Sequence, residues 1–317
     1  MVHCLPVPLI HIGYHKTGTS WLQKLVFNNQ DIGFISPIIY RDIVDTLVIP
    51  NALDFDHHTC RDTFNQAVNV AHNLNLTPVF SAERLSGHPH SGGYDAKMIA
   101  DRLVQIFPRA KVLIVIREQR NIILSCYMQY ISRGGAITLP SYLKAPYMRM
   151  IPLFNLDHFK YHRLISYYHK LYNQDNVLVL PYELFNNNPK LYVSRILRFC
   201  NLPNAEDFWH QQPEKMVINK SLSGFEAQFR LYTNFLFGTR YNLNQHSLFP
   251  LSWEKTNLIF KVIRKINEYI PQSYNQRILR RMSGKVAEVA GDTYKLSNLY
   301  TSELINLDLS QYGYMTP

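Results

Sequence analysis

The chain has 317 residues, of which 46% are hydrophobic and 18% charged, and its formal net charge is +10. A chain of this length and composition buries a sizeable core, which excludes a disordered protein and a disulfide-stapled miniature. No apolar run approaches the roughly 20 residues of a membrane-spanning helix, so we expect no membrane span. The positive charge favours an anionic partner without saying whether it is a nucleotide, an acidic glycan, a membrane surface or nucleic acid.

Five β-favouring segments recur along the first two thirds of the chain, with helical stretches between them, at residues 9–13, 33–39, 78–82, 111–117 and 176–181. The segment that begins at Lys111 is apolar without alternation, which is typical of a parallel strand covered on both faces. We therefore expect an α/β fold, a three-layer sandwich with a central parallel sheet of the P-loop nucleotide-binding kind.

Apolar periodicity predicts helices over residues 20–28, from Asp95 to Pro108, and from Pro189 to about residue 202. Asp95 is the candidate N-cap of the second of these helices. Strand signals stop after about residue 205, so the C-terminal part is expected to be mostly helical. No repeat or linker divides the chain. We expect a single domain over 1–317, with an α/β core over about 1–205 and a helical extension over about 206–317.

The helical part contains a strongly basic stretch, with eight lysines and arginines against the single acid Glu268 between residues 255 and 285. Such a stretch is either a set of solvated helix faces or a surface for an anionic partner, and both interpretations stay open.

The first strand leads into a short loop with two glycines, GYHKTGTSW at residues 13–21. Gly13 and Gly18 let the backbone N–H groups turn inward, and the following helix N-terminus adds partial positive charge. Lys16 and the hydroxyls of Thr19 and Ser20 complete a cradle for an anion. The sequence therefore predicts a phosphate-binding loop.

This loop departs from the nucleotide-kinase pattern G-x-x-x-x-G-K-[ST], because Thr19 stands where that pattern has lysine. The strand ends that would supply a magnesium-binding aspartate carry Glu83 and Arg117 instead. Both departures disfavour a metal-dependent kinase, and we expect no metal site.

The run Lys16-Thr17-Gly18-Thr19-Ser20-Trp21 resembles the 5′-phosphosulfate loop of the sulfotransferases that use 3′-phosphoadenosine 5′-phosphosulfate (PAPS). The resemblance implies transfer of a sulfuryl group from PAPS to a hydroxyl, less often an amine, of a small molecule or carbohydrate, with release of the desulfated product PAP and no need for a metal. It assigns donor binding to the loop residues His15, Lys16, Thr17, Gly18, Thr19, Ser20 and Trp21.

Further positions extend the resemblance to about residue 200. Arg117 ends a strand and Ser125 follows eight residues later. In this family an arginine and a serine at these places hold the 3′-phosphate of the donor. The alternative interpretation is an ordinary surface arginine and a helix serine. Tyr182, in a Pro-Tyr-Glu run, and Trp21 would flank adenine, with plain core packing as the alternative.

Lys220 and Ser221 stand where the family closes a loop over the 3′-phosphate. The Arg-Lys-Gly run of the cytosolic branch is absent there, so a donor contact and a surface loop stay equally open.

In the implied mechanism Lys16 neutralises the charge that develops on the leaving phosphate. The histidine base that the cytosolic branch carries in a Lys-Thr-His stretch is missing. Glu83, at the carboxyl end of a strand, is the preferred base, since the glycan-sulfating branch uses a carboxylate. His88, His90 and His15 are the alternatives, and an ion pair of Glu83 with Arg84 or Arg117 that merely orders the loop is the other interpretation.

The group His57, His58 and Cys60 is expected to be a surface loop, not a metal site, because no further ligand stands at a fitting spacing. The four cysteines, at positions 4, 60, 126 and 200, form no CxxC pair, which predicts reduced thiols and a cytoplasmic protein.

Two rival functions stay open beside sulfuryl transfer: a P-loop phosphoryl-transfer enzyme such as a kinase, and a non-catalytic binder of an anionic polymer or membrane. The acceptor is not legible in the sequence. A glycan, a natural product or a phenol suits the loops at 41–61, 133–160 and 225–253 equally well, no nucleic-acid partner is expected, and the oligomeric state is left open.

Overall fold

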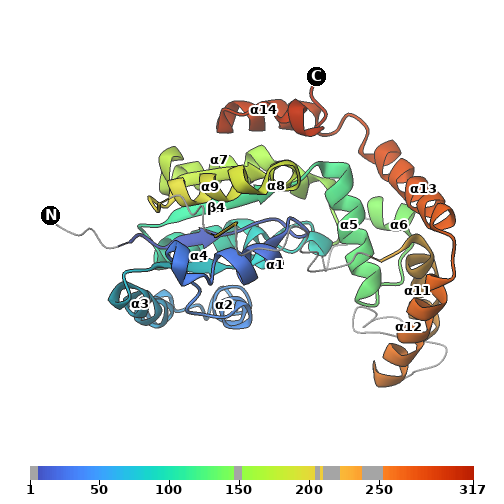
Figure 1. Cartoon of the computed structure of the whole chain (residues 1–317), viewed down its shortest axis with the longest axis horizontal. Helices are drawn as coiled ribbons and strands as arrows, with labels where there is room; N and C mark the ends of the chain where they lie inside the picture. The colour runs from blue at the N-terminus through green and yellow to red at the C-terminus, as the bar shows by residue number, and fades with distance from the viewer. Residues whose placement is uncertain (1–5, 146–151, 204–207, 210–221, 238–252) are drawn as a thin grey trace. The chain divides into compact units, whose positions relative to one another are not determined.

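A computed structural model describes residues 6–145, 152–203, 208–209, 222–237 and 253–317 (Figure 1). The chain forms two compact units. The first unit comprises Met1–Glu118, Asp157–Ile218 and Asp292–Pro317, and the second comprises Gln119–Leu156 and Asn219–Gly291. The assignment of the whole chain to one domain stays a prediction.

The first unit is built on a five-stranded sheet with the order β2-β3-β1-β4-β5, in which every pairing is parallel. Its strands are β1 (Leu9–His11), β2 (Phe34–Ile35), β3 (Thr77–Ser81), β4 (Lys111–Ile116) and β5 (Val177–Pro181). The predicted parallel α/β sheet is therefore confirmed. Strand β2 is much shorter than the segment 33–39, and β1 ends before Gly13, although the N–H groups of Ile12 and Tyr14 still donate to β4 carbonyls at 3.0 Å.

One face of this sheet is covered by the helical segments that follow β1 and β5. Leu9, Val79, Leu113 and Leu180 are buried there against helices η1 (Leu22–Val26), α8 (Tyr182–Asn187) and α9 (Pro189–Phe199). Side chains alternate along a strand, so the next residues face the opposite side.

The opposite face carries α3 (His57–Asn73), α4 (Ala96–Ile106) and α7 (Tyr161–Tyr172). Phe80 of β3 packs there against Phe64 of α3, with ring centroids 5.2 Å apart, and against Phe107 at the end of α4, at 4.8 Å. Helix layers on both faces of one sheet confirm the predicted three-layer sandwich.

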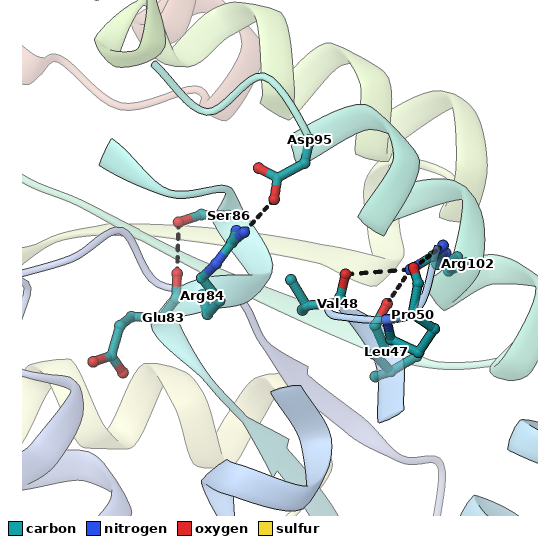
Figure 2. Close-up of polar contacts among 8 residues, drawn as sticks. All are labelled: Leu47, Val48, Pro50, Glu83, Arg84, Ser86, Asp95 and Arg102. Atoms are coloured by element: carbon teal, nitrogen blue, oxygen red, sulfur yellow. Dashed lines mark hydrogen bonds and ion pairs between the residues drawn. The ribbon is translucent and has the colours of Figure 1, made fainter. Parts of the chain in front are cut away.

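Arg102 of α4 is a buried cation that holds the end of α2 (Tyr40–Leu47) in place (Figure 2). Its guanidinium donates to the carbonyls of Leu47 and Pro50, both at 2.8 Å, and of Val48 at 3.4 Å. A cation suits this position because the carbonyls at a helix C-terminus lack intrahelical partners and carry partial negative charge.

Three local predictions differ from the structure. The predicted helix over 20–28 starts as α1 (Thr19–Trp21) and widens into the π-helix η1, where the N–H of Phe27 reaches the carbonyl of Leu22 at 2.8 Å. Asp95 stands at the N-cap of α4 but makes no capping hydrogen bond, because its carboxylate is paired with Arg84. The group at His57 is not a surface loop, since it opens α3 behind the N-cap Asp56.

The C-terminal residues return to the first unit. Helix α14 (Lys295–Ile305) lies along α7, as Figure 1 shows, and the short helix η7 (Leu309–Tyr312) follows it. The His162 ring of α7 shares a 2.8 Å hydrogen bond with the hydroxyl of Ser297 in α14. This return brings Tyr314 against the strand ends of the sheet.

Within its described residues the second unit contains helices and no strand. It contains α5 (Gln119–Ser132), α6 (Leu139–Leu143), α11 (Gly224–Phe237), α12 (Trp253–Glu268) and α13 (Gln272–Ala290). Helix α5 packs against α11 and α13, and buried Asn234 of α11 donates to the carbonyls of Ile131 and Gly135 at 2.8 and 2.9 Å. The predicted mostly helical C-terminal part is thus confirmed, and no helix in the described part of the chain is long and apolar enough to cross a membrane.

Candidate active site

The glycines of the loop between β1 and α1 stand where the backbone is closely approached. A Cβ added to Gly13 would lie 2.6 Å from Nε2 of His11, and one added to Gly18 would lie 2.9 Å from Cε2 of Tyr182. Gly18 also has φ of 81°, which disfavours any L side chain. Both positions therefore require glycine, and the loop keeps the narrow turn that the sequence predicts.

Lys16 lies at the crest of this loop in a left-handed conformation, with φ of 68°. A residue other than glycine pays about 1–3 kcal/mol for such a backbone, so it persists only where neighbours hold it. Arg117, the residue after β4, donates from Nη1 to the carbonyl of Lys16 at 2.9 Å. The structure thus brings two of the predicted donor residues into direct contact.

The loop hydroxyls have different partners. The buried Thr17 hydroxyl donates to the carbonyl of Tyr14, so this side chain shapes the loop itself. Thr19 Oγ1 is buried and has no hydrogen-bond partner among the described residues, while Ser20 is half-buried in the first turn of α1. A buried hydroxyl without a partner is costly, so Thr19 fits a cradle that an anionic group completes.

Arg117 is held at the end of β4 by groups on both sides. The Tyr161 hydroxyl donates to its carbonyl at 2.6 Å, and its guanidinium lies over the Tyr182 ring, 5.0 Å from the centroid. Of the other residues predicted to hold the 3′-phosphate, Ser125 lies in α5, and Lys220 and Ser221 lie outside the described residues.

An aromatic group adjoins the loop on the side of α8. Trp21 packs against Phe185 with ring centroids 4.7 Å apart, and its ring is within 18° of parallel to that of Trp209 at 6.5 Å. Tyr182 contacts the same Phe185 at 5.8 Å. Sequence reasoning missed Trp209, because it follows the last predicted core helix and no local pattern joins it to the loop.

Glu83 follows β3 directly and opens the short helix η3 (Glu83–Ser86), whose turn is closed by the Ser86 hydroxyl donating to the Glu83 carbonyl at 2.9 Å. Figure 2 shows the Glu83 carboxylate pointing away from Arg84. Arg84 is paired with the buried Asp95.

The histidines that were alternatives to Glu83 gather beside the loop. The His88 ring is 5.9 Å from that of His15 and 5.1 Å from that of His90, measured between centroids. The loop after η3 therefore returns to the phosphate loop.

Two further histidines near the loop are neutral. Burial lowers the pKa of His11 to about 3, and its Nδ1 shares a 2.7 Å hydrogen bond with the Ser81 hydroxyl. Burial also lowers the pKa of His158 to about 3, and its ring packs 5.0 Å from that of Tyr14. No sequence signal singled out either residue, because each is defined by partners distant in the chain.

A cavity of about 370 Å³ opens in the first unit behind Tyr14. Its walls come from the phosphate loop, the glycine turn before α4, and the start of α7, and they comprise Tyr14, Gly92, Gly93, Tyr94, Ala96, Lys97, Asp157, His158, Lys160, Arg163, Leu164 and Tyr167. Asp157 pairs with Lys160 at 2.6 Å and with Arg163 at 2.9 Å, so two cations share one carboxylate at its rim. The volume suits a small molecule.

Potential metal ligands do not gather at this site. Across the part of the chain that the structure describes, no group of three or more histidine, cysteine, aspartate or glutamate residues is arranged to hold a metal ion. The strand ends carry the cations Lys16 and Arg117 and the loop hydroxyls, which suit an anion, together with the carboxyl groups of Glu83 and Glu183.

The architecture is similar to that of a sulfotransferase from Alicyclobacillus acidocaldarius (17% identity, 72% of this chain and 92% of that one, TM-score 0.45). It is also similar to the sulfotransferase domain of the curacin biosynthetic pathway (12%, 81% and 98%, 0.39) and to a mouse sulfotransferase complexed with PAP (14%, 95% and 88%, 0.37).

No curated protein sequence matches the chain. The family model described as sulfotransferase domain matches residues 7–234, which include the glycine loop, the ends of β3, β4 and β5, and the aromatic group beside α8. The chain belongs to the sulfotransferase family.

Proposed function

We propose that the protein transfers the sulfuryl group of PAPS to a hydroxyl, less often an amine, of a small-molecule or carbohydrate acceptor and releases PAP. The observation that carries this proposal is the contact between the two predicted donor residues: Lys16 is held in its left-handed conformation by Arg117 at 2.9 Å. Two cationic residues, Lys16 and Arg117, are joined by this hydrogen bond, and such a pair suits a donor that carries phosphate groups at two positions.

Several residues of the loop bind the 5′-phosphosulfate of the donor. Thr19, Ser20 and the α1 N-terminus bind the 5′-phosphosulfate, with Gly18 giving the donor close access to the backbone. Thr17 contributes through its backbone N–H, because its hydroxyl is occupied by the Tyr14 carbonyl. His15, the residue before Lys16, is proposed as a further contact of the 5′-phosphosulfate.

Arg117 binds the 3′-phosphate, with Ser125, Lys220 and Ser221 proposed as further contacts. The rings of Trp21 and Tyr182 bind adenine, and the near-parallel ring of Trp209 is added to them on the strength of its geometry.

In the transfer step the acceptor oxygen attacks sulfur in line, the bond between sulfur and the 5′-phosphate oxygen breaks, and PAP leaves with the electron pair. Lys16 stabilises the charge on that leaving oxygen. Glu83 takes the proton of the acceptor hydroxyl, a role supported by its position directly after β3 and by a carboxylate that points away from Arg84. His88 is the second candidate for the base that accepts this proton, and His90 is the third.

The cavity behind Tyr14 is proposed as the acceptor site. Its lining includes Tyr14 of the phosphate loop, and Gly92 and Gly93 belong to the loop that carries His88. Its lining carries Lys97, Lys160 and Arg163. Asp157 pairs with the last two and Asp101 pairs with Lys97, which leaves an excess of one positive charge and favours an acceptor with an anionic group on a ring or sugar.

Two probes that differ at C6 of the sugar test this acceptor class: 4-nitrophenyl β-glucoside, which has a hydroxymethyl group there, and 4-nitrophenyl β-glucuronide, which has a carboxylate. We expect the glucuronide to have the lower KM, and Arg163→Gln to remove the difference while leaving PAP affinity unchanged. Equal KM values for the two probes in the unaltered protein, or a glucuronide preference that survives Arg163→Gln, would rule out this use of the cavity.

The proposed reaction itself is tested by incubating the protein with ³⁵S-labelled PAPS and a mixture of hydroxylated acceptors in the presence of EDTA. Label should move from PAPS to an acceptor in spite of the chelator. Turnover only with ATP and Mg²⁺ would identify the phosphoryl-transfer alternative. Salt-sensitive binding of heparin or anionic vesicles without turnover would identify the non-catalytic alternative. The cytoplasmic location stays a prediction.

A further inference from the structure

A chain of hydrogen bonds leads from the C-terminal segment to the phosphate loop, and all of it lies within the first unit. The Tyr314 hydroxyl donates to Oε2 of Glu183 at 3.1 Å, and Oε1 of Glu183 accepts the backbone N–H of Glu118 at 3.0 Å. The neighbouring Arg117 donates to the carbonyl of Lys16 at 2.9 Å. The last residues of the chain are thus linked to the loop lysine.

Each member of this chain is fixed by its surroundings. Tyr314 and Glu118 are buried, at 3% and 4% exposure, and Glu183 is half-buried. The Tyr314 backbone N–H donates to the carbonyl of Leu309, and Asn298 of α14 donates to the carbonyl of Met315 at 2.8 Å. The tyrosine hydroxyl is therefore presented to Glu183 by a segment that is itself anchored.

The Glu183 carboxylate depends on these donors. Burial raises its pKa, while the N–H of Glu118, the hydroxyl of Tyr314 and the charge of Arg117 act in the opposite direction. Loss of the tyrosine hydroxyl leaves one carboxylate oxygen without that donor and weakens the hold on the Glu118 N–H.

The position of Arg117 decides the conformation of Lys16. A left-handed lysine must be held by its neighbours, and the Arg117 guanidinium donates to its carbonyl. Whatever fixes the end of β4 therefore also supports the backbone conformation from which the Lys16 side chain extends.

We propose that Tyr314 and Glu183 are positioning residues of the donor site. They hold the Arg117–Glu118 segment so that Arg117 keeps Lys16 in the conformation required for sulfuryl transfer. The inference rests on the proposed function, and it gives a role to the C-terminal segment, for which no chemistry was predicted from the sequence.

The variant Tyr314→Phe removes one oxygen and keeps the ring. We expect the Kd for PAP, measured by calorimetry, to rise and kcat/KM for PAPS to fall, each about 5- to 10-fold, because a hydrogen bond to a charged group is lost. The KM for the acceptor should not change. The matched control is Tyr312→Phe, since Tyr312 packs against the apolar core two residues away, and both constants should stay within about twofold.

A double-variant cycle separates positioning from general stabilisation. If Tyr314 acts through Arg117, adding Tyr314→Phe to Arg117→Ala should produce little further loss, and Glu183→Gln should retain more activity than Glu183→Leu because it keeps an acceptor for the Glu118 N–H. Losses that multiply in the double variant would overturn the proposal.

A lowered melting temperature of Tyr314→Phe with unchanged PAP affinity and kcat/KM would also overturn it, because that is the result of a merely structural role. Failure of the unaltered protein to bind PAP would instead refute the proposed function. The two failures are therefore distinguishable.

Discussion

The two units both carry cations, but they hold them in different ways. In the first unit Lys16 and Arg117 are half-buried and joined by a hydrogen bond at the ends of strands. In the second unit the eight cations between residues 255 and 285 are all exposed on α12 and α13. Exposed charges attract anions at long range, whereas fixed donors stabilise charge as it develops. The net charge of the chain is therefore a poor guide to its chemistry.

The strongest test of this difference between the units is to remove the fixed cation Lys16, and it has the largest expected effect. We expect Lys16→Ala to lower kcat about 10²- to 10³-fold, because the leaving phosphate loses its neutralising donor. The exposed Lys24, on the helix that follows the loop, supplies the control, and Lys24→Ala should leave kcat within about twofold. Single-turnover kinetics with PAPS measure both, and similar losses in the two variants would contradict a special role for the loop lysine.

The next effect concerns the proposed base. Glu83→Gln should lower kcat about 10²-fold while leaving the Kd for PAP unchanged, because the amide keeps the shape of the side chain but accepts no proton. The matched change His88→Gln should lower kcat by a smaller factor. The reverse order, with near-full activity in Glu83→Gln, would move the base to the histidine group.

Arg102 separates burial of a cation from catalysis, because it is a buried cation of the first unit that does not contact the phosphate loop. Arg102→Met should lower the free energy of unfolding by about 2 to 3 kcal/mol, since the carbonyls at the end of α2 lose their donors. The exposed Arg109 gives the control, with a change of less than about 0.5 kcal/mol expected for Arg109→Met. Urea unfolding measures both, and equal midpoints would contradict the structural role assigned to Arg102.

The smallest effect is expected for the exposed cations of the second unit. Lys261→Glu combined with Lys265→Glu should change kcat/KM for PAPS by less than about twofold at physiological ionic strength, because salt screens solvent-exposed charges. A tenfold loss that disappears at high salt would show that this surface takes part in donor capture and would remove the distinction between the units.

Much of the fold follows from local signals in the sequence. Strand β4 is a continuous apolar run, and the glycine loop after β1 needs only the spacing of Gly13 and Gly18 to be identified. The parallel sheet and the phosphate loop are predictable because each depends on residues that are neighbours in the chain.

The remainder depends on partners that are distant in the chain. Arg102 and Leu47 are 55 residues apart, and Tyr314 lies 131 residues after Glu183. Asp95 has the local signature of a helix cap, yet its pairing with Arg84 prevails over that role. Periodicity and capping rules describe a segment alone, so they give no account of side chains whose partners are chosen by tertiary packing.

The central claim is that the loop around Lys16 binds an adenosine 3′,5′-bisphosphate donor, and calorimetric titration of the unaltered protein with PAP tests it most directly. We predict binding at micromolar or lower Kd in the presence of EDTA, weakened at least tenfold in Arg117→Ala. Absence of heat with PAP, together with binding of ATP that requires Mg²⁺, would contradict the account.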